Sequence, residues 1–238
     1  VALNSGTDAL VFGLAAIGVR RGDEVITPPN SFVASTSAIT HLGAKPVFVD
    51  ILSDTWCIDP KRVEEAITPK TRAVIATHLY GNLCEMTELL SIGEKFNIPI
   101  IEDAAEAIGS VYHGELAGSM GKFGTFSFHG SKTITTGEGG MLVTNDTSLY
   151  EKVFTLGNHG RAREETKQFW PSDIGFKYKM SNVQAAIGCA QLERICELVE
   201  RKRMILDYYR HCIGQTGLIV MNPIQKGIVS GAWMPNAV

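Results

Sequence analysis

The sequence predicts an α/β fold in which a mostly parallel sheet is covered by helices on both faces. Short apolar segments alternate along the chain with longer segments of helical periodicity. These short segments are largely apolar, which is typical of strands buried on both faces with helical crossovers between them. In open sheets of this kind, ligands bind beyond the carboxyl ends of the strands. The residues that follow each strand are therefore the first candidates for a site.

Each expected strand is a short apolar or β-branched run that ends at a turn or a polar residue. The strands are expected at residues 24–27, 46–50, 73–77, 98–103, 125–128 and 141–144. The chain opens with Val1 to Asn4, which have the composition of a strand end that leads into a turn.

Helices are expected where apolar residues recur at helical spacing after a capping residue. They cover residues 7–19, 33–42, 60–67, 86–96 and 149–156, and a long helical stretch covers 182–210. Ser5 caps the first helix, and Asp59-Pro60 supplies a cap followed by proline at the first helical position. We expect a large domain over residues 1–200, with its N-terminal segment missing. A linker helix and the truncated beginning of a small C-terminal domain are expected over 201–238.

Composition and charge favour a soluble globular protein. Of the 238 residues, 45% are hydrophobic and 20% are charged, and the net charge is −3. The chain has no basic block, so a nucleic-acid partner is not favoured. No apolar run approaches the roughly 20 residues that span a bilayer, and no secretory signal opens the chain. A membrane partner is therefore not expected.

The cysteines and histidines predict neither disulfides nor a metal centre. The five cysteines are odd in number, and no two of them form a C-x-x-C pair. We interpret them as free thiols, buried for structural reasons, in a reducing compartment, which predicts a cytoplasmic location. The six histidines form no H-E-x-x-H or similar set, so a dedicated metal site is not expected.

Lys132 and Asp103 are the strongest candidates for chemistry. Lys132 follows the aromatic strand 126–128 and precedes the glycine-rich run 137–140, and Asp103 ends the apolar run 98–101. An amine in a tight turn and a carboxylate at a strand's end are what a pyridoxal phosphate site needs. The lysine forms the Schiff base, and the aspartate keeps the pyridine nitrogen protonated. Taken singly, each has an ordinary alternative, a solvated loop lysine or a helix cap.

Weaker candidates surround these two residues. Small residues at 5–7 open a helix, whose N-terminus favours an anion such as phosphate. Phe32, after a strand end, either stacks on a cofactor ring or belongs to the core. Glu106 lies about one turn after Asp103 and could reach a phenolic oxygen. Ser127 is a candidate phosphate ligand, and His129 either lines the site or packs.

Eight sequence blocks follow one another along most of the chain. They are Ser5–Leu10, Gly22–Pro28, Gly43–Asp50, His78–Gly81, Ile101–Ala107, Phe126–Lys132, Gly137–Gly140 and Met180–Ala186. This succession resembles the DegT/DnrJ/EryC1/StrS family of pyridoxal phosphate (PLP)-dependent nucleotide-sugar aminotransferases. The resemblance extends from Ser5 to about Arg203. The forms Glu-Asp-Ala-Ala-Glu-Ala and Thr-Thr-Gly-Glu-Gly-Gly-Met look most like the perosamine synthase branch.

The resemblance implies a PLP-dependent transferase type I fold, active as a homodimer with shared sites. It implies that Lys132 is the catalytic Schiff-base lysine and the general acid/base of the proton shift. It further implies that Gly6, Thr7 and Ser127 bind the phosphate, Phe32 stacks on the ring, Asp103 binds the ring nitrogen, and Glu106 replaces the family's frequent glutamine near the phenolic oxygen.

Two departures from the family pattern are visible. Residues 175–180 read Gly-Phe-Lys-Tyr-Lys-Met where the family commonly has Gly-Tyr-Asn-Tyr-Arg-Met. Lys177 therefore takes the place of an asparagine that reaches the other subunit's phosphate, and a lysine can bind phosphate as a point charge. The chain starts without methionine and lacks the family's N-terminal segment and most of its small domain, so we expect a fragment of a longer protein.

The leading functional hypothesis is amino transfer from L-glutamate to a keto carbon, C4 by resemblance, of a nucleotide-linked deoxysugar. Such sugars enter cell-surface polysaccharides, including the O-antigen of lipopolysaccharide. One alternative is a pyridoxamine phosphate-dependent sugar dehydratase of the same family, in which histidine replaces the lysine. Another is a regulatory protein that binds the cofactor without turnover.

Overall fold

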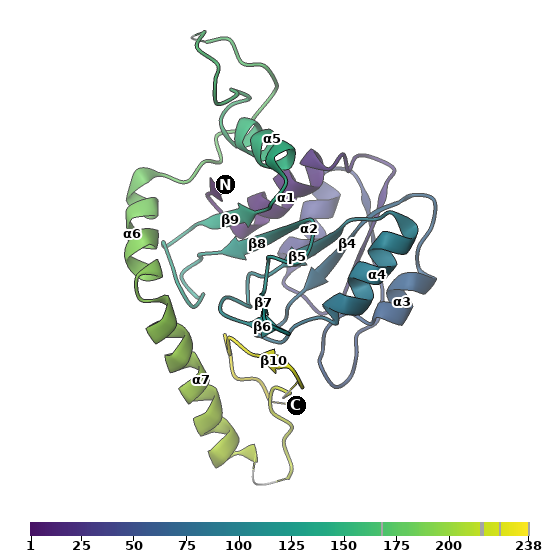
Figure 1. Cartoon of the computed structure of the whole chain (residues 1–238), viewed down its shortest axis with the longest axis vertical. Helices are drawn as coiled ribbons and strands as arrows, with labels where there is room; N and C mark the ends of the chain where they lie inside the picture. Colours follow the sequence, from purple (N-terminus) through teal and green to yellow (C-terminus); the bar gives the residue numbers. More distant parts are fainter. Residues whose placement is uncertain (168, 215–216, 224, 238) are drawn as a thin grey trace.

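A seven-stranded mixed sheet with helices on both faces forms the body of the protein (Figure 1). This computed structural model describes residues 1–167, 169–214, 217–223 and 225–237. The strand order is β1-β9-β8-β5-β4-β2-β3. Strands β3, β2, β4, β5 and β8 are parallel, and β9 and β1 are added antiparallel at one edge. The predicted α/β fold with a mostly parallel sheet is confirmed.

The strands of the seven-stranded sheet lie within a few residues of their predicted positions. They are β1 (Ala2–Leu3), β2 (Glu24–Thr27), β3 (Lys45–Phe48), β4 (Thr71–Thr77), β5 (Ile100–Asp103), β6 (Val111–Tyr112), β7 (Glu115–Leu116), β8 (Phe123–Ser127), β9 (Gly140–Val143) and β10 (Ile228–Val229). Strands β10, β6 and β7 form a second, three-stranded sheet that was not predicted. Its two-residue strands are too short to show a periodicity in the sequence.

The helices agree with the prediction except near the C-terminus. They are α1 (Gly6–Ala16), α2 (Val33–His41), α3 (Pro60–Glu65), α4 (Met86–Phe96), α5 (Thr147–Gly157), α6 (Asn182–Leu192) and α7 (Ile195–Cys212). The predicted single helical stretch over 182–210 is wrong, because the chain breaks at Glu193-Arg194 between α6 and α7. Neither glycine nor proline marks this break, so the sequence carries no signal for it.

Local hydrogen bonds explain where the helices begin and end. The Ser5 hydroxyl accepts a hydrogen bond from the Asp8 N–H at 3.0 Å and caps α1. The Asp59 carboxylate caps α3 in the same way through the Lys61 N–H at 2.9 Å. Helix α4 ends at Asn97 in the left-handed region with φ 53°, which turns the chain directly into β5.

Alternate residues of the central strands supply two separate hydrophobic cores. Ala73 and Ile75 of β4 face the core shared with α1, α2 and α5. Val74 and Ala76 of the same strand face the core shared with α3 and α4. Because successive side chains of a strand point to opposite faces, each residue near a strand's end is directed to one side of the sheet. This alternation decides which polar residues share a site.

The C-terminal part of the chain runs along one side of the sheet. Helix α7 extends away from the sheet, and the chain then returns beside β6 and β7 (Figure 1). The Arg203 guanidinium donates to the carbonyls of Ser230 at 2.8 Å and Gly109 at 3.0 Å and so joins α7 to both segments. The predicted domain boundary at 200/201 falls inside α7. Residues 215–216, 224 and 238 of the predicted small domain lie outside the described residues, and the domain division stays a prediction.

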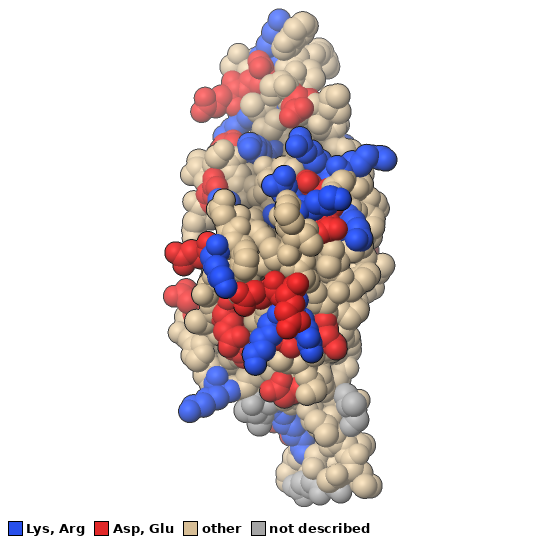
Figure 2. Space-filling view, turned by 90° about the vertical axis from the view of Figure 1, so that its right-hand side faces the viewer, with Lys and Arg blue, Asp and Glu red and all other residues tan. Residues whose placement is uncertain are grey.

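The face covered by α3 and α4 carries charged side chains of both signs. Figure 2 shows acidic side chains gathered at its middle and basic ones toward its upper end. Exposed ion pairs join Lys95 to Glu64 across the two helices and Arg62 to Glu65 within α3. Among the described residues, no helix is long and apolar enough to cross a membrane.

The cysteines are only partly as expected. All five are free in the structure, and Cys57 and Cys84 are buried. The prediction of burial is wrong for Cys189, Cys196 and Cys212, which are exposed on α6 and α7. Both helices present exposed side chains on the surface of this chain, and the sequence pattern does not distinguish such helices from buried ones.

Candidate active site

The residues singled out from the sequence meet in one cavity at the carboxyl edge of the sheet. Parallel strands β2, β4, β5 and β8 end there, beside the N-terminus of α1. The cavity has a volume of about 380 Å³. Its lining includes Gly6, Thr7, Phe32, Thr77, Asp103, Glu106, Ser127, His129, Lys132 and Trp233. Seven of these ten residues are the predicted cofactor-binding residues other than Lys177.

Lys132 reaches into this cavity from the turn that follows β8. Its backbone N–H donates to the His129 carbonyl at 2.9 Å, which closes the turn. Its Nζ lies 3.5 Å from the Glu106 Oε1, and the lysine side chain is only 13% exposed. A lysine in a solvated loop would be far more exposed. The position therefore favours the chemical interpretation of Lys132.

Asp103 presents a buried carboxylate that no cation of the described chain neutralises. It is 6% exposed. Its Oδ2 accepts from the Ser35 hydroxyl at 2.7 Å and its Oδ1 from the Ala105 N–H at 3.3 Å. Both donors are neutral, and no Lys, Arg or His of the described residues lies within ion-pair distance. A buried anion is costly without a cationic partner, so this carboxylate suits a protonated ring nitrogen.

The first turn of α1 forms a cradle for an anion. Ser5 caps the Asp8 N–H, and within the described residues the N–H groups of Gly6 and Thr7 have no protein acceptor. A Cβ added at Gly6 would lie 3.0 Å from the Ser127 Cβ, so only glycine leaves the space open there. With the helix dipole behind it, this turn fits a phosphate.

The glycine-rich run after Lys132 acts mainly through close packing. Gly137 alone of this run has positive φ, at 80°, so only this position needs the conformational freedom of glycine. A Cβ at Gly140 would meet the Ser5 carbonyl carbon and oxygen at 2.2 Å. Gly140 therefore lets β9 approach the start of α1 and thereby places the phosphate cradle beside Lys132.

Glu106 lines the same cavity as Asp103. Its Oε2 accepts from the Tyr80 N–H at 3.1 Å, and its side chain is 10% exposed. Burial raises the pKa of the Glu106 carboxyl, although nearby Lys132 acts in the other direction. A carboxyl with a raised pKa can donate or accept a proton at an oxygen of a bound ligand.

The remaining predicted residues are placed less decisively. Phe32 precedes α2, is 70% exposed and lines the cavity. His129 lies beyond the end of β8 rather than on the strand, and its Nδ1 is 2.9 Å from the Ser131 Oγ. Lys177 is exposed in a bridge with Asn158 and does not line this cavity. Its role across a subunit interface stays a prediction.

Three residues of the site were missed in the sequence. Ser35 lies three residues after Phe32 in the first turn of α2, so helical spacing could have indicated it. Thr77 lines the cavity at 5% exposure, and its hydroxyl has no hydrogen-bond partner among the residues that the structure describes. Its alternation with Ile75 could have indicated it. Trp233 lies 102 residues after Ser131, which it contacts, and no local sequence signal identifies it.

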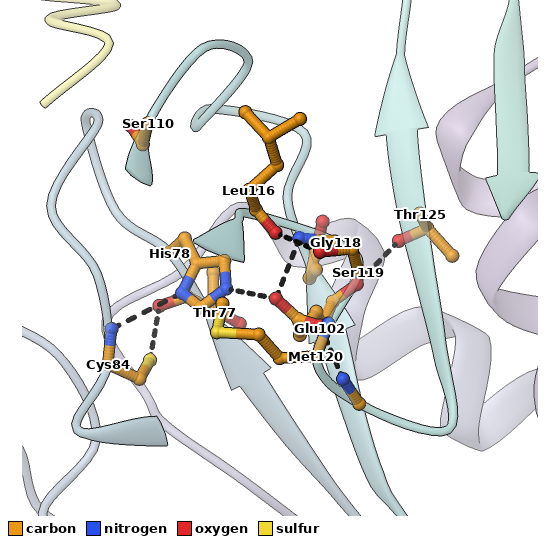
Figure 3. Close-up of polar contacts among 12 residues, drawn as sticks. Thr77, His78, Cys84, Glu102, Ser110, Leu116, Gly118, Ser119, Met120 and Thr125 are labelled. Carbon is orange, nitrogen blue, oxygen red and sulfur yellow. Dashed lines mark hydrogen bonds and ion pairs between the residues drawn. The ribbon is translucent and has the colours of Figure 1, made fainter. Parts of the chain in front are cut away.

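A second buried carboxylate stands next to Asp103 but belongs to a different environment. Glu102 pairs with Ala76 of β4, so it shares the α3/α4 side of the sheet, and it is fully buried. Figure 3 shows its carboxylate between His78 and the segment that carries Gly118 and Met120. Its two oxygens accept from the N–H groups of Gly118 (2.7 Å), Met120 (2.7 Å) and Gly121 (2.6 Å), and its Oε2 lies 3.0 Å from the His78 Nε2.

Glu102 is consequently a structural residue. Because the His78 Nδ1 accepts from the Cys84 N–H at 3.3 Å, the ring proton lies on Nε2 and is donated to Glu102. Burial alone would raise the pKa of the Glu102 carboxyl, but His78 and the backbone donors outweigh burial and hold it low. The cluster leaves Glu102 no free lone pair for a ligand and fixes the loop before β8.

The orphan hydroxyl of Thr77, the unneutralised Asp103 and the open cradle at Gly6 have complementary chemistry. One needs a polar partner, one a cation and one an anion. A phosphorylated pyridine ring carries all three on one small molecule. An aldehyde on it would meet the amine of Lys132, the one lysine among the described residues that line the cavity. The residues present therefore fit PLP.

Comparison with known proteins identifies the family. The model of the DegT/DnrJ/EryC1/StrS aminotransferase family matches residues 1–238. The chain is 43% identical over 232 residues to GDP-perosamine synthase of Escherichia coli O157:H7, covering 98% of this chain and 63% of that protein. It is 43% identical over 223 residues to GDP-perosamine synthase of Caulobacter vibrioides, covering 94% and 60%.

Solved structures give the same result for the fold. DesV of S. venezuelae, in complex with a ketimine intermediate, superposes with a TM-score of 0.91 at 33% identity, covering 98% of this chain and 62% of that chain. The PLP form of the putative sugar aminotransferase Spr1654 from Streptococcus pneumoniae gives 0.89 at 33% identity, covering 98% and 64%. The expected type I transferase fold is confirmed. The chain spans less than two thirds of the length of each of these relatives.

Proposed function

The chain belongs to the DegT/DnrJ/EryC1/StrS aminotransferase family, and we propose that it is the PLP-dependent core of a nucleotide-sugar aminotransferase. L-Glutamate is the proposed amino donor, and a keto carbon of a nucleotide-linked deoxysugar is the acceptor. The observation that carries this proposal is the meeting of Lys132, Asp103 and the first turn of α1 in one cavity. The names of the two GDP-perosamine synthases favour a GDP-linked 4-keto-6-deoxyhexose.

Each part of the cofactor has a residue suited to hold it. When bound, PLP supplies an electron sink for the carbanion formed at the carbon that carries nitrogen. Gly6, Thr7 and Ser127 hold its phosphate through hydrogen bonds. Asp103 holds the ring nitrogen in its protonated form, and Phe32 covers a ring face. A lysine such as Lys177 from a second subunit would add a positive charge near the phosphate.

Lys132 has two tasks in the proposed reaction. Its amine holds the cofactor covalently between turnovers, and once free it moves a proton between the substrate carbon and the cofactor carbon next to the ring. Its low exposure keeps water away from this amine. Glu106 stabilises the positive charge of the amine, because its Oε1 lies 3.5 Å from Nζ.

Lys132 also favours amino transfer over the alternative dehydratase. In the dehydratase branch that the resemblance brings in, histidine takes the place of this lysine. The sequence has lysine at that position, and the cavity places its amine against Glu106 and away from bulk water. A regulatory role without turnover would not require that arrangement.

Assembly and location belong to the same proposal. We infer a homodimer with shared sites, supported by large apolar side chains that α6 and α7 leave exposed. Among them are Val183 at 72%, Met204 at 62% and Tyr208 at 69% exposure. The proposed enzyme acts in the cytoplasm in the synthesis of cell-surface polysaccharide, including O-antigen. A soluble sugar nucleotide as substrate is consistent with that location.

The direct test is substrate conversion. Purified protein with PLP is incubated with L-glutamate labelled with ¹⁵N and with GDP-, dTDP- or UDP-linked 4-keto-6-deoxyhexoses. Label that appears in the GDP-linked aminosugar is the expected result. A sugar that loses oxygen without gaining ¹⁵N would support the dehydratase instead, and no reaction with any of the sugars would contradict the proposed function.

A further inference from the structure

Trp233 forms a wall of the cavity directly against the reactive lysine. It is 8% exposed and lies just beyond β10. Its indole Nε1–H donates to the Ser131 carbonyl at 3.0 Å, next to Lys132 in the chain. The Lys132 Nζ lies 4.1 Å from the centre of the Trp233 ring. A residue more than a hundred positions away is thus fixed over the amine.

Two more aromatic residues belong to the same cluster as Trp233. The Tyr80 ring stacks on Trp233 with centroids 6.1 Å apart and an interplanar angle of 15°. The Trp56 ring meets Tyr80 edge-on at 6.5 Å. We call Trp56, Tyr80 and Trp233 the aromatic ladder. Its members come from three segments that are far apart in the sequence.

The backbone at the aromatic ladder is strained. Trp56 and Tyr80 have φ of 63° and 57°, and Ala232, which precedes Trp233, has 52°. The left-handed region is unfavourable for a non-glycine residue, and bulky side chains occupy it rarely. Such strain persists where the surrounding structure fixes it and is concentrated at ligand sites. Two members of the aromatic ladder and the residue before the third share this unfavourable conformation, so the surrounding structure must fix it.

Buried hydrogen bonds hold this strained arrangement. The Gly231 N–H donates to the Ser110 hydroxyl at 2.8 Å, and that hydroxyl donates to the Gly81 carbonyl at 2.8 Å. The Ser230 hydroxyl donates to the same carbonyl at 3.1 Å. The segment that carries Trp233 is therefore fastened to the segment that carries Tyr80. A rigid, flat wall results.

The Trp233 ring contacts both the Tyr80 ring and the Lys132 amine, and Trp233 also lines the cavity. A ligand in the cavity therefore meets the indole beside the Lys132 amine. The sugar carbon that takes nitrogen from the aminated cofactor must lie within reach of the Lys132 amine, which moves the proton. It therefore lies close to the Trp233 ring, whose centre is 4.1 Å from that amine. The ring is large, apolar and flat, and it suits the C–H face of a pyranose ring or its deoxy methyl group.

We propose that Trp233 is the residue against which the sugar ring packs, and that it acts selectively in the sugar half of the reaction. This inference rests on the proposed function. L-Glutamate is acyclic and carries two carboxylates, so it gains little from an apolar ring face. The competing interpretation is that Trp233 only positions Lys132, in which case both halves of the reaction depend on it equally.

The two halves can be measured separately on the PLP-loaded protein. In the first, L-glutamate alone discharges the visible absorption of the bound cofactor. In the second, the aminated protein regains that absorption when the GDP-linked 4-keto-6-deoxyhexose is added. Trp233→Leu removes the flat face, and Trp233→Phe keeps a smaller one. Equilibrium binding of the GDP-linked aminosugar product gives a readout that does not depend on turnover.

For Trp233→Leu we expect a glutamate half-reaction within about threefold of wild type, with the apparent Kd for the sugar raised at least about tenfold. The apparent Kd of Trp233→Phe for the sugar should lie between those of wild type and Trp233→Leu. If the leucine variant does not fold, the phenylalanine variant is used for the test. Product binding should weaken in parallel. Equal loss in both halves, or unchanged sugar binding, would overturn the inference. A wild-type protein that fails the glutamate half-reaction would instead contradict the proposed function.

Discussion

Glu102 and Asp103 are consecutive residues of β5, both carboxylates and both buried, yet their surroundings are opposite. Glu102 faces α3 and α4 and receives hydrogen bonds from three backbone N–H groups and from His78 (Figure 3). Asp103 faces the cavity and receives two hydrogen bonds from neutral donors. A buried carboxylate whose lone pairs all accept hydrogen bonds from the protein has a structural role. One that the protein leaves without a cationic partner is suited to bind a ligand.

The largest effect is expected at Asp103. Asp103→Asn keeps the shape of the side chain but removes the negative charge that keeps the ring nitrogen protonated. We expect kcat/KM to fall about 10²- to 10⁴-fold, with the melting temperature unchanged or raised, because an uncompensated buried charge is gone. Steady-state kinetics and thermal melts of the same preparation check both parts. A variant that melts early would assign Asp103 the structural role of Glu102.

Glu102→Gln should give the reverse pattern. A glutamine amide would place N–H groups against the N–H donors that now point at the carboxylate. Breaking such a buried charged cluster costs about 3–5 kcal/mol, to be measured by urea unfolding. The fraction that remains folded should keep its cofactor spectrum. A stable Glu102→Gln protein that has lost PLP would mean that the cluster belongs to the active site.

The pH dependence of stability should separate the two sides of the sheet. The pKa of Glu102 is held low in the folded protein, so its contribution is present above the unfolded value, roughly 4.3, and is lost as pH falls through the folded pKa. The pKa of Glu106 is raised, so it costs stability as pH rises from about 4.3 through its folded value. Urea unfolding of cofactor-free protein against pH should show both slopes.

Glu106→Gln serves as the matched variant for that experiment. It should remove the loss of stability with rising pH and leave the acid-side loss, which belongs to Glu102, in place. If the variant loses the acid-side slope instead, the assignment of the two carboxylates is reversed.

The smallest effect is expected at Ser35, which orients Asp103 without touching the cavity. Ser35→Ala removes the hydrogen bond that the neutral Ser35 hydroxyl donates to the Asp103 carboxylate. A hydrogen bond to a charged group contributes about 1.5–3 kcal/mol at most. We expect PLP affinity to fall about three- to tenfold and the pH titration of the bound chromophore to shift. Ser35→Thr should restore both. A purely structural serine would change the melting temperature without moving the titration.

The sequence was informative where structure and chemistry are local. Strands such as β2 (Glu24–Thr27) and the positions of Lys132, Asp103 and Gly6 follow from periodicity, strand ends and motifs that lie within a few residues. The role of Glu102 could not be predicted, because its donors come from the loop at 118–121. Trp233 could not be predicted either, since the contacts that place it span about a hundred residues or more.

The sequence also did not predict which helix faces are exposed at the surface. Helix α6 is apolar in composition and has none of its residues buried within this chain. A periodic apolar pattern predicts a buried face but does not say which molecule covers it. The wrong expectation of burial for Cys189 and Cys196 has the same origin.

Lys132 is proposed as the lysine that binds the cofactor, in a cavity that Asp103 also lines. The most direct measurement is borohydride reduction of the PLP-loaded protein, followed by mass spectrometry of its peptides. The prediction is a phosphopyridoxyl mass on the peptide containing Lys132, with no such label in Lys132→Ala. Label on a different lysine, or wild-type protein that binds PLP without forming a reducible adduct, would contradict it.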